Sequence, residues 1–213
     1  AQLAADIARA GFPVFRFDRR GIGDSDGENR GFRKSQADIA AALDAFRALA
    51  PGVTRVVGFG NCDAATALML ASGAGCDALV LSNPWTIDED ADAMPPPATI
   101  RARYIARLKD PHEVLRLLGG KVDFRKLLRG IAWASAPRRK PGSLALEARE
   151  GLSKFDGPVR ILIAESDRTA QVFLENWEAG DSRLQRCADA GHSYAEPHAR
   201  KWLRDQILAA LRR

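Results

Sequence analysis

Residues 58–66, GFGNCDAAT, lie at the point where a run rich in β-branched residues gives way to a run of alanines. The preceding residues, VTRVVGF (53–59), predict a strand, and DAATALMLASG (63–73) predicts a helix. The chemically reactive side chain on the turn between them is Cys62. A cysteine at such a place is either a nucleophile on a tight turn or a packed core residue, and the rest of the chain has to decide between the two.

Strand-like and helix-like segments alternate through residues 1–84. Leu3, Ile7 and Ala10 share one helical face, and Ser35 fits the N-cap of a second helix, with Asp38 in the capping-box position three residues on. The predicted strands in this part of the chain are FPVFRFD (12–18), residues 53–59 and DALVLSNP (77–84). Short β-α-β-α-β connections of this kind predict a parallel sheet with helices on both faces.

The alternation breaks from Trp85 onwards and resumes near Gly157. Residues 85–156 contain a run of three prolines (95–97) that is followed by amphipathic helical patterns, which predict an inserted helical cap. The predicted core therefore comprises residues 1–84 and 157–213. Its second part reads as a strand (157–167), a helix (170–180), a strand with a loop (182–192) and a closing helix (196–213).

Length and composition favour one α/β domain. The chain has 213 residues, of which 46% are hydrophobic, but no apolar run is long enough for a membrane span and the start does not resemble a signal peptide. We therefore expect a cytoplasmic protein. The three cysteines show no metal-ligand or disulfide spacing, so we expect neither a metal nor a cofactor. The net charge of +5 comes from scattered basic residues, which gives no reason to expect a nucleic-acid partner, and the oligomeric state is left open.

Small residues flank Cys62 at the two places where a nucleophile elbow needs them. Gly60 lies two residues before it and Ala64 two residues after it. The turn would place the thiol at a helix N-terminus, which favours the thiolate, and would leave the backbone N–H of Asp63 free to stabilise an oxyanion. This short pattern alone occurs often, and a buried packing cysteine explains it as well.

Two further residues favour the nucleophile interpretation. Asp167 and His192 each follow a predicted parallel strand, and the carboxyl ends of such strands form the sites of open α/β sheets. His192 would take the thiol proton and later protonate the leaving group, while Asp167 would hold the imidazole tautomer. His112, in the predicted cap, and His198, in the last helix, are expected to be surface or capping residues. Cys76 and Cys187 are expected to be packing residues, and the Asp63 side chain is expected to point away from the site.

Four segments together resemble the α/β-hydrolase superfamily. They are FRFDRRGIGDSDG (15–27), GFGNCDAA (58–65), AESDRTA (164–170) and DAGHSYA (189–195). The glycine-rich loop is interpreted as structural, since it does not lead directly into a helix as a phosphate-binding loop does. A cysteine followed by aspartate in the elbow resembles, more narrowly, the bacterial hydrolases associated with exosortase A systems.

The resemblance also implies a departure from the superfamily. In that fold the third strand lies between the fourth and fifth, and no residues before Ala1 supply it, so we expect that the chain has lost its beginning and with it the second oxyanion donor. The implied activity is hydrolysis of an ester or thioester of a small acyl substrate through a Cys62-His192-Asp167 triad, with Asp63 N–H as one oxyanion donor. Acyl transfer by the same triad and a non-catalytic binding protein of the same fold are the alternatives.

Overall fold

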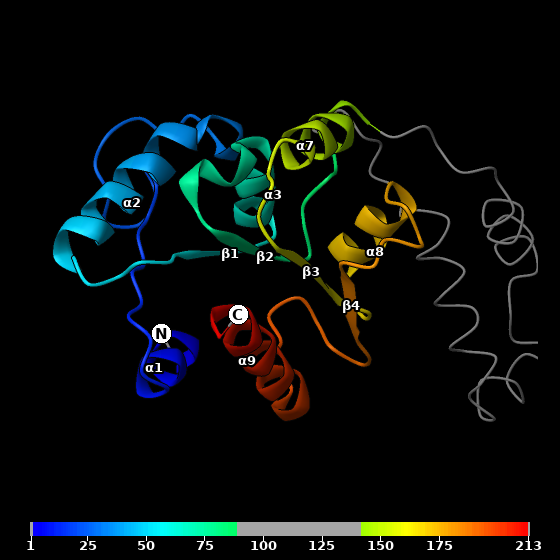
Figure 1. Ribbon diagram of the computed structural model, residues 1–213. Helices are drawn as coiled ribbons and strands as arrows, with labels where there is room; N and C mark the ends of the chain where they lie inside the picture. Colours follow the sequence, from blue (N-terminus) through cyan, green and yellow to red (C-terminus); the bar gives the residue numbers. More distant parts are fainter. Residues whose placement is uncertain (1, 89–141, 213) are drawn as a thin grey trace, which may run out of the picture.

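A four-stranded parallel sheet forms the centre of the protein (Figure 1). The structure is a computed structural model that describes residues 2–88 and 142–212. The strands follow the spatial order β1-β2-β3-β4, each pairing in parallel with the next. This confirms the parallel α/β fold that the alternating segments predict. The strands are β1 (Val57–Asn61), β2 (Ala78–Ser82), β3 (Val159–Ala164) and β4 (Leu184–Cys187).

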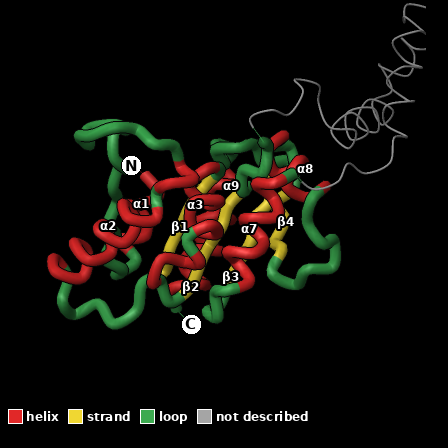
Figure 2. Tube along the Cα trace, turned by 90° about the horizontal axis from the view of Figure 1, so that it is seen from above, coloured by secondary structure: helices red, strands yellow, loops and turns green. Residues whose placement is uncertain are grey.

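Helices cover both faces of this sheet (Figures 1 and 2). On one face lie α1 and α9, and on the other lie α2, α3, α7 and α8. The helices are α1 (Gln2–Arg9), α2 (Gln36–Leu49), α3 (Asp63–Leu70), α7 (Ser143–Ser153), α8 (Arg168–Glu175) and α9 (Pro197–Leu211), with short 3-10 turns at η1 (Phe32–Lys34) and η2 (Ser72–Gly75). In the part of the chain that the structure describes, no helix is long and apolar enough to cross a membrane.

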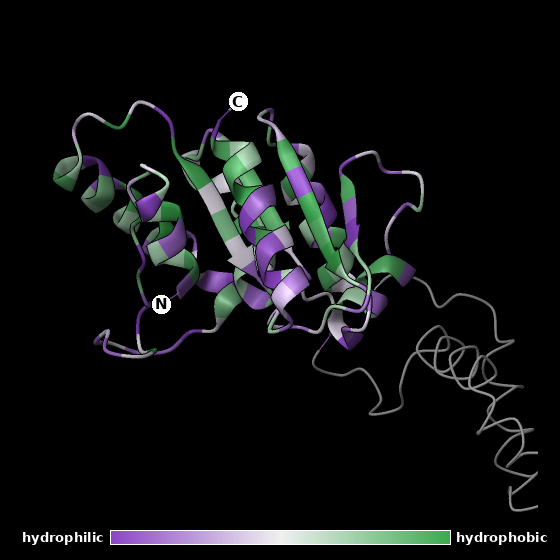
Figure 3. Cartoon of the chain, turned by 90° about the horizontal axis from the view of Figure 1, so that it is seen from below, coloured by the Kyte–Doolittle hydropathy of each residue, from purple (hydrophilic) through white to green (hydrophobic). Residues whose placement is uncertain are grey.

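The central strands β2 and β3 are mostly apolar because they are covered on both faces of the sheet, with Ser82 and Arg160 as their polar residues. Leu79 and Leu81 of β2 pack into the core beneath α2, α3 and α7, while Val80 faces the opposite core with α1 and α9. Successive side chains of a strand point to opposite faces, so a strand covered on both sides buries successive side chains. Figure 3 shows the result, with mostly hydrophobic central strands beside helices that are hydrophobic on one side.

The predicted strand at residues 12–18 is wrong. This segment is irregular and runs between α1 and α2 (Figure 1), and the side chains of Val14 and Phe17 are 40% and 45% exposed. A strand needs a neighbour that satisfies its backbone N–H and C=O groups, and no segment among the described residues pairs with this one. Phe15 stacks on Phe46 of α2 instead, with ring centroids 5.6 Å apart.

The capping box predicted at the start of α2 does not form either. Ser35 is the N-cap residue, but its buried hydroxyl makes no hydrogen bond to the helix. Asp38 accepts hydrogen bonds from the backbone and guanidinium of Arg20 instead, at 2.6 to 3.2 Å. A partner distant in sequence has thus replaced the local one.

Most of the predicted cap, residues 85–156, lies outside the described residues, and the domain division stays a prediction. Within that range the structure describes α7, which packs on α3 and contributes Ala148 and Leu152 to the core.

Candidate active site

Cys62 occupies a sharp turn between β1 and α3. Its backbone has φ 62° and ψ −123°, a conformation that is strained for any residue with a side chain. The turn is held because the Cys62 N–H donates to the Ser82 carbonyl at 2.9 Å, while its own carbonyl accepts from Thr66 N–H at 3.2 Å. Strain at a strand-to-helix turn is the feature that lifts a nucleophile above the sheet in an elbow.

Gly60 permits this turn because β1 and α3 approach each other closely. A β-carbon on Gly60 would lie 2.5 Å from the carbonyl carbon of Ala64 and 2.5 Å from the amide nitrogen of Ala65. Both atoms belong to the backbone of the first turn of α3, so neither can rotate away. Any larger residue at position 60 would therefore clash with the backbone of α3, which explains why the elbow needs a glycine there.

The Cys62 thiol is half-buried, and its pKa is raised from its ordinary value. Burial is the main cause, because it penalises the charged thiolate, and the negative charges of Asp63 and Asp167 act in the same direction. The backbone N–H of Asp63, predicted as an oxyanion donor, lowers the pKa of the thiol but does not outweigh this shift. The pKa of the thiol is therefore set mainly by burial, whereas the sequence prediction considered only the helix N-terminus.

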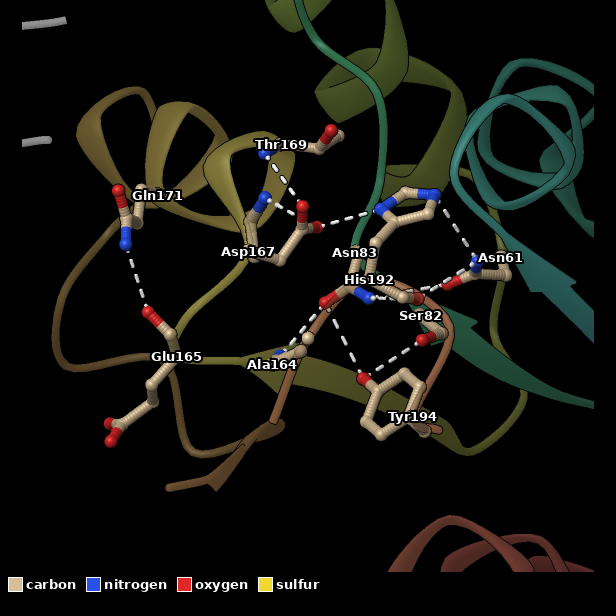
Figure 4. Close-up of polar contacts among 12 residues, drawn as sticks. Asn61, Ser82, Asn83, Ala164, Glu165, Asp167, Thr169, Gln171, His192 and Tyr194 are labelled. Atoms are coloured by element: carbon tan, nitrogen blue, oxygen red, sulfur yellow. Dashed lines mark hydrogen bonds and ion pairs between the residues drawn. The ribbon is translucent and has the colours of Figure 1, made fainter. Parts of the chain in front are cut away.

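Asp167 and His192 are hydrogen-bonded to each other. Asp167 is the N-cap of α8, and its carboxylate accepts from the N–H groups of Thr169 and Ala170, both at 3.2 Å. The same carboxylate lies 2.9 Å from His192 Nδ1 (Figure 4). Asp167 is buried, whereas 42% of the His192 side chain is exposed. The carboxylate is thus fixed by the helix start, and the ring projects from it to the surface.

The third predicted residue, Cys62, is not hydrogen-bonded to this pair. Among the described residues, no hydrogen bond joins the Cys62 thiol to His192. The ring nitrogen that would act as base, His192 Nε2, lies 3.5 Å from the side-chain nitrogen of Asn61, the residue before Cys62. His192 therefore lies at the elbow, but its Nε2 atom faces Asn61 and not the Cys62 thiol.

The Asp63 side chain is bound by a loop residue rather than by the helix. Arg19 donates to its carboxylate at 2.9 Å, which connects the glycine-rich loop to the elbow. In the same loop, the Ser25 hydroxyl donates to the Asp18 carbonyl at 2.6 Å. These contacts agree with the structural interpretation of the loop.

The remaining cysteines and described histidine lie elsewhere. Cys76 and Cys187 are buried, and burial raises the pKa of both thiols, that of Cys76 to about 11. His198 lies in α9 with Nε2 3.0 Å from the Ala188 carbonyl. His112 is outside the described residues. Within the described part of the chain, no cluster of three or more His, Cys, Asp or Glu side chains is arranged to hold a metal.

Sequence reasoning missed a group of polar side chains under the histidine. Asn61, Ser82, Asn83 and Tyr194 form a connected hydrogen-bonded network there (Figure 4). The sequence feature that could have indicated this network is Asn83, a polar residue directly after the buried strand β2. It shares the carboxyl edge of the sheet with Asn61 and His192.

A parallel sheet covered by helices on both faces, with a strained strand-to-helix turn and an acid-histidine pair on the loops at its carboxyl edge, defines the α/β-hydrolase fold. A model of the alpha/beta hydrolase family matches residues 1–206, so the chain belongs to that family.

Solved structures with the same fold are distant in sequence. A monoacylglycerol lipase from Paleococcus ferrophilus aligns with TM-score 0.55 and 16% identity, covering 99% of this chain and 87% of that one. Est1E from Butyrivibrio proteoclasticus, solved with ferulic acid bound, aligns with TM-score 0.52 and 19% identity over 99% of this chain and 82% of its own. The esterase RhEst1 from Rhodococcus sp. ECU1013 aligns with TM-score 0.51 and 20% identity, covering 98% of this chain and 83% of that one. No curated protein shows a significant match.

Proposed function

We propose that this protein hydrolyses an ester or thioester of a small acyl substrate, with Cys62 as nucleophile, His192 as general base and acid, and Asp167 as the residue that orients the histidine. The observation that carries the proposal is the 2.9 Å hydrogen bond between His192 Nδ1 and the buried Asp167 carboxylate beside the strained turn of Cys62. An acid-histidine pair next to a nucleophile is the arrangement that acyl transfer needs.

The reaction takes place in two steps. His192 Nε2 removes the thiol proton as Cys62 Sγ attacks the acyl carbonyl, and the negative charge on the carbonyl oxygen is stabilised by Asp63 N–H. The bond to the leaving alcohol or thiol then breaks, and His192 returns the proton to it, which leaves a thioester on Cys62. In the second step His192 takes a proton from water, the resulting hydroxide attacks the thioester, and Cys62 leaves as a thiol when the acid is released.

The raised pKa of Cys62 bears on how this nucleophile is activated. Since the resting thiol is held in its neutral form, the proposed reaction depends on proton removal by His192 during the attack rather than on a preformed thiolate. For this to happen the imidazole has to move from Asn61 to the neighbouring thiol, a change that rotation of an exposed ring can provide. On the resemblance of the elbow to hydrolases associated with exosortase A, we extend the proposal to an acyl substrate of exosortase or exopolysaccharide systems.

The test is hydrolysis of a panel of short-chain p-nitrophenyl esters and aryl thioesters. Cys62→Ala and His192→Gln are expected to reduce kcat/KM by about 10³-fold or more. Cys76→Ala is the matched control, because it removes a thiol outside the site, and it should retain activity. Equal rates for the wild type and Cys62→Ala would contradict the proposal.

One observation favours a second candidate, a non-catalytic protein that binds a ligand with the same fold. The Nε2 atom of His192 faces Asn61 and not the Cys62 thiol. If this candidate is right, the wild type will hydrolyse no member of the panel. Acyl transfer by the same residues would instead appear as an amide or ester product when an amine or alcohol acceptor is added.

A further inference from the structure

The side chains of Asn61 and Asn83 lie between three strand ends and the histidine loop (Figure 4). Asn83 follows β2, is fully buried, and has a backbone φ of 42°. Asn61 is the last residue of β1 and is half-buried. A carboxamide has a donor end and an acceptor end, and its orientation follows from its partners. When two carboxamides are hydrogen-bonded to each other, the orientation of both can be deduced from one neighbouring group that can only donate or only accept.

The backbone N–H of Ala164 is that partner. A backbone N–H can only donate, and it lies 2.8 Å from Asn83 Oδ1 in a buried position at the end of β3. The oxygen of Asn83 therefore faces β3, and its nitrogen faces Asn61 Oδ1 at 3.2 Å. The oxygen of Asn61 is thereby oriented towards Asn83, and its nitrogen is left facing His192 Nε2 at 3.5 Å.

The backbone carbonyl of His192 confirms this direction independently. A carbonyl oxygen can only accept, and it lies 3.4 Å from the side-chain nitrogens of both Asn61 and Asn83. Reversing either carboxamide would place oxygen against oxygen at this point. The Tyr194 hydroxyl, 3.4 Å from Asn83 Oδ1, donates to it and accepts from Ser82, which is also consistent.

The two ends of the His192 ring therefore meet opposite partners. Asp167 is at Nδ1, where it requires a proton on the ring, and Asn61 presents N–H groups at Nε2, where they require a lone pair. Of the two neutral tautomers, only the one with its proton on Nδ1 suits both partners, because an Nε2–H would face the amide hydrogens of Asn61.

We propose that Asn61, oriented by Asn83, is a positioning residue that holds His192 with a proton on Nδ1 and an unprotonated Nε2 beside the nucleophile elbow. The assignment rests on the proposed function only where it concerns catalysis, since the state of the ring can be observed without a substrate. Asn61 acts through His192, and no contact of its side chain with the reacting atoms is required.

The test is the ¹⁵N NMR spectrum of the histidine rings at neutral pH, in which protonated and unprotonated ring nitrogens give distinct shifts. The chain has three histidines, and the signals of His192 are those lost in His192→Gln. The wild-type protein is expected to show a protonated Nδ1 and an unprotonated Nε2 for His192. His198 serves as an internal reference for the opposite tautomer, because its Nε2 donates to the Ala188 carbonyl.

Asn61→Asp reverses the partner at Nε2 with almost no change in shape. Its carboxylate can only accept, so we expect the Nε2 signal of His192 to move to the protonated position while the His198 signals stay unchanged and report an intact fold. Asn61→Leu removes the donor without supplying an acceptor and should give an intermediate shift. The matched control is Asn176→Asp, which adds the same charge to a carboxamide whose nitrogen donates to the Val172 carbonyl away from the site.

An unprotonated Nε2 in Asn61→Asp, or a protonated Nε2 in the wild type, would overturn the inference. If the panel assay detects hydrolysis, Asn61→Asp is also expected to lower kcat by about 10²-fold, the contribution of a general base. The inference and the proposed function can fail separately. The ring signals decide the inference, and the effects of Cys62→Ala and His192→Gln on turnover decide the proposed function.

Discussion

Replacing Gly60 by alanine is expected to destabilise the protein strongly, because the added carbon would enter the backbone of α3. It would lie 2.5 Å from two backbone atoms, on Ala64 and Ala65, and 2.6 Å from the carbonyl oxygen of Ala64. A contact between non-bonded carbon atoms is normally about 3.5–4.0 Å long, so β1 and α3 would have to separate by about 1 Å. The helix cannot yield there without displacing Cys62, which begins the same turn.

The size of the destabilisation depends on whether side chains or backbone atoms have to move. Overpacking that flexible side chains can relieve costs about 1–3 kcal/mol, and a backbone contact belongs at the top of that range. We therefore expect Gly60→Ala to lower the free energy of unfolding by about 3 kcal/mol or more. For a chain of this size each kcal/mol shifts Tm by about 2–4 °C, so Tm should fall by about 6–12 °C.

Gly52→Ala is the matched control for this experiment. Nothing lies within 4 Å of a β-carbon built on Gly52, which is exposed in the turn after α2. The same substitution there should leave stability unchanged or raise it by about 0.4–1 kcal/mol. The assay is thermal unfolding followed by circular dichroism. If both variants unfold within about 1 °C of the wild type, the close approach of β1 and α3 does not exist and the elbow geometry is wrong.

Three further predictions concern charge and backbone strain. Asp63→Asn removes a negative charge that raises the pKa of Cys62, so alkylation of Cys62 at neutral pH, followed by mass spectrometry, should become about 2- to 5-fold faster; an unchanged or slower rate would count against this account of the thiol. The hydrogen bond from Arg183 lowers the pKa of Asp181 to about 2, so its stabilisation is fully present above about pH 4 and is lost as the pH falls through 2. Urea unfolding should show that Asp181→Asn is less stable than the wild type at pH 7 and that the difference narrows towards pH 2, whereas a constant difference would refute the linkage. At Asn83, whose φ is 42°, Asn83→Ala should be less stable than Asn83→Gly by about 1 kcal/mol in the same assay, and equal stabilities would show that the turn is unstrained.

Most of the fold could be predicted because its determinants are local. Strands β2 and β3 are covered on both faces and are mostly apolar, a pattern that can be detected in the sequence. The failure at residues 12–18 has a non-local cause. These residues have the composition of a strand, but a strand exists only if another segment pairs with it, and the sequence of one segment does not contain that information.

The candidate site likewise has features that the sequence could predict and features that depend on the three-dimensional structure. Chain order and strand ends were sufficient to single out Asp167 and His192 as a pair. The raised pKa of Cys62 has burial as its main cause, and the burial of this side chain is set by the tertiary structure rather than by the elbow motif. The role of Asn61 depends on the direction of a hydrogen-bonded chain that starts at Ala164, and such a direction exists only in three dimensions.

The most direct test of the proposed function is to trap the acyl group on the protein. The wild type would be mixed with an aryl thioester, quenched in acid before turnover is complete, digested, and mapped by mass spectrometry. We predict an acyl adduct on the peptide that contains Cys62, with none on the peptides that contain Cys76 or Cys187. Hydrolysis accompanied by an adduct on any other residue, or hydrolysis at an undiminished rate in Cys62→Ala, would contradict the assignment of Cys62 as the nucleophile.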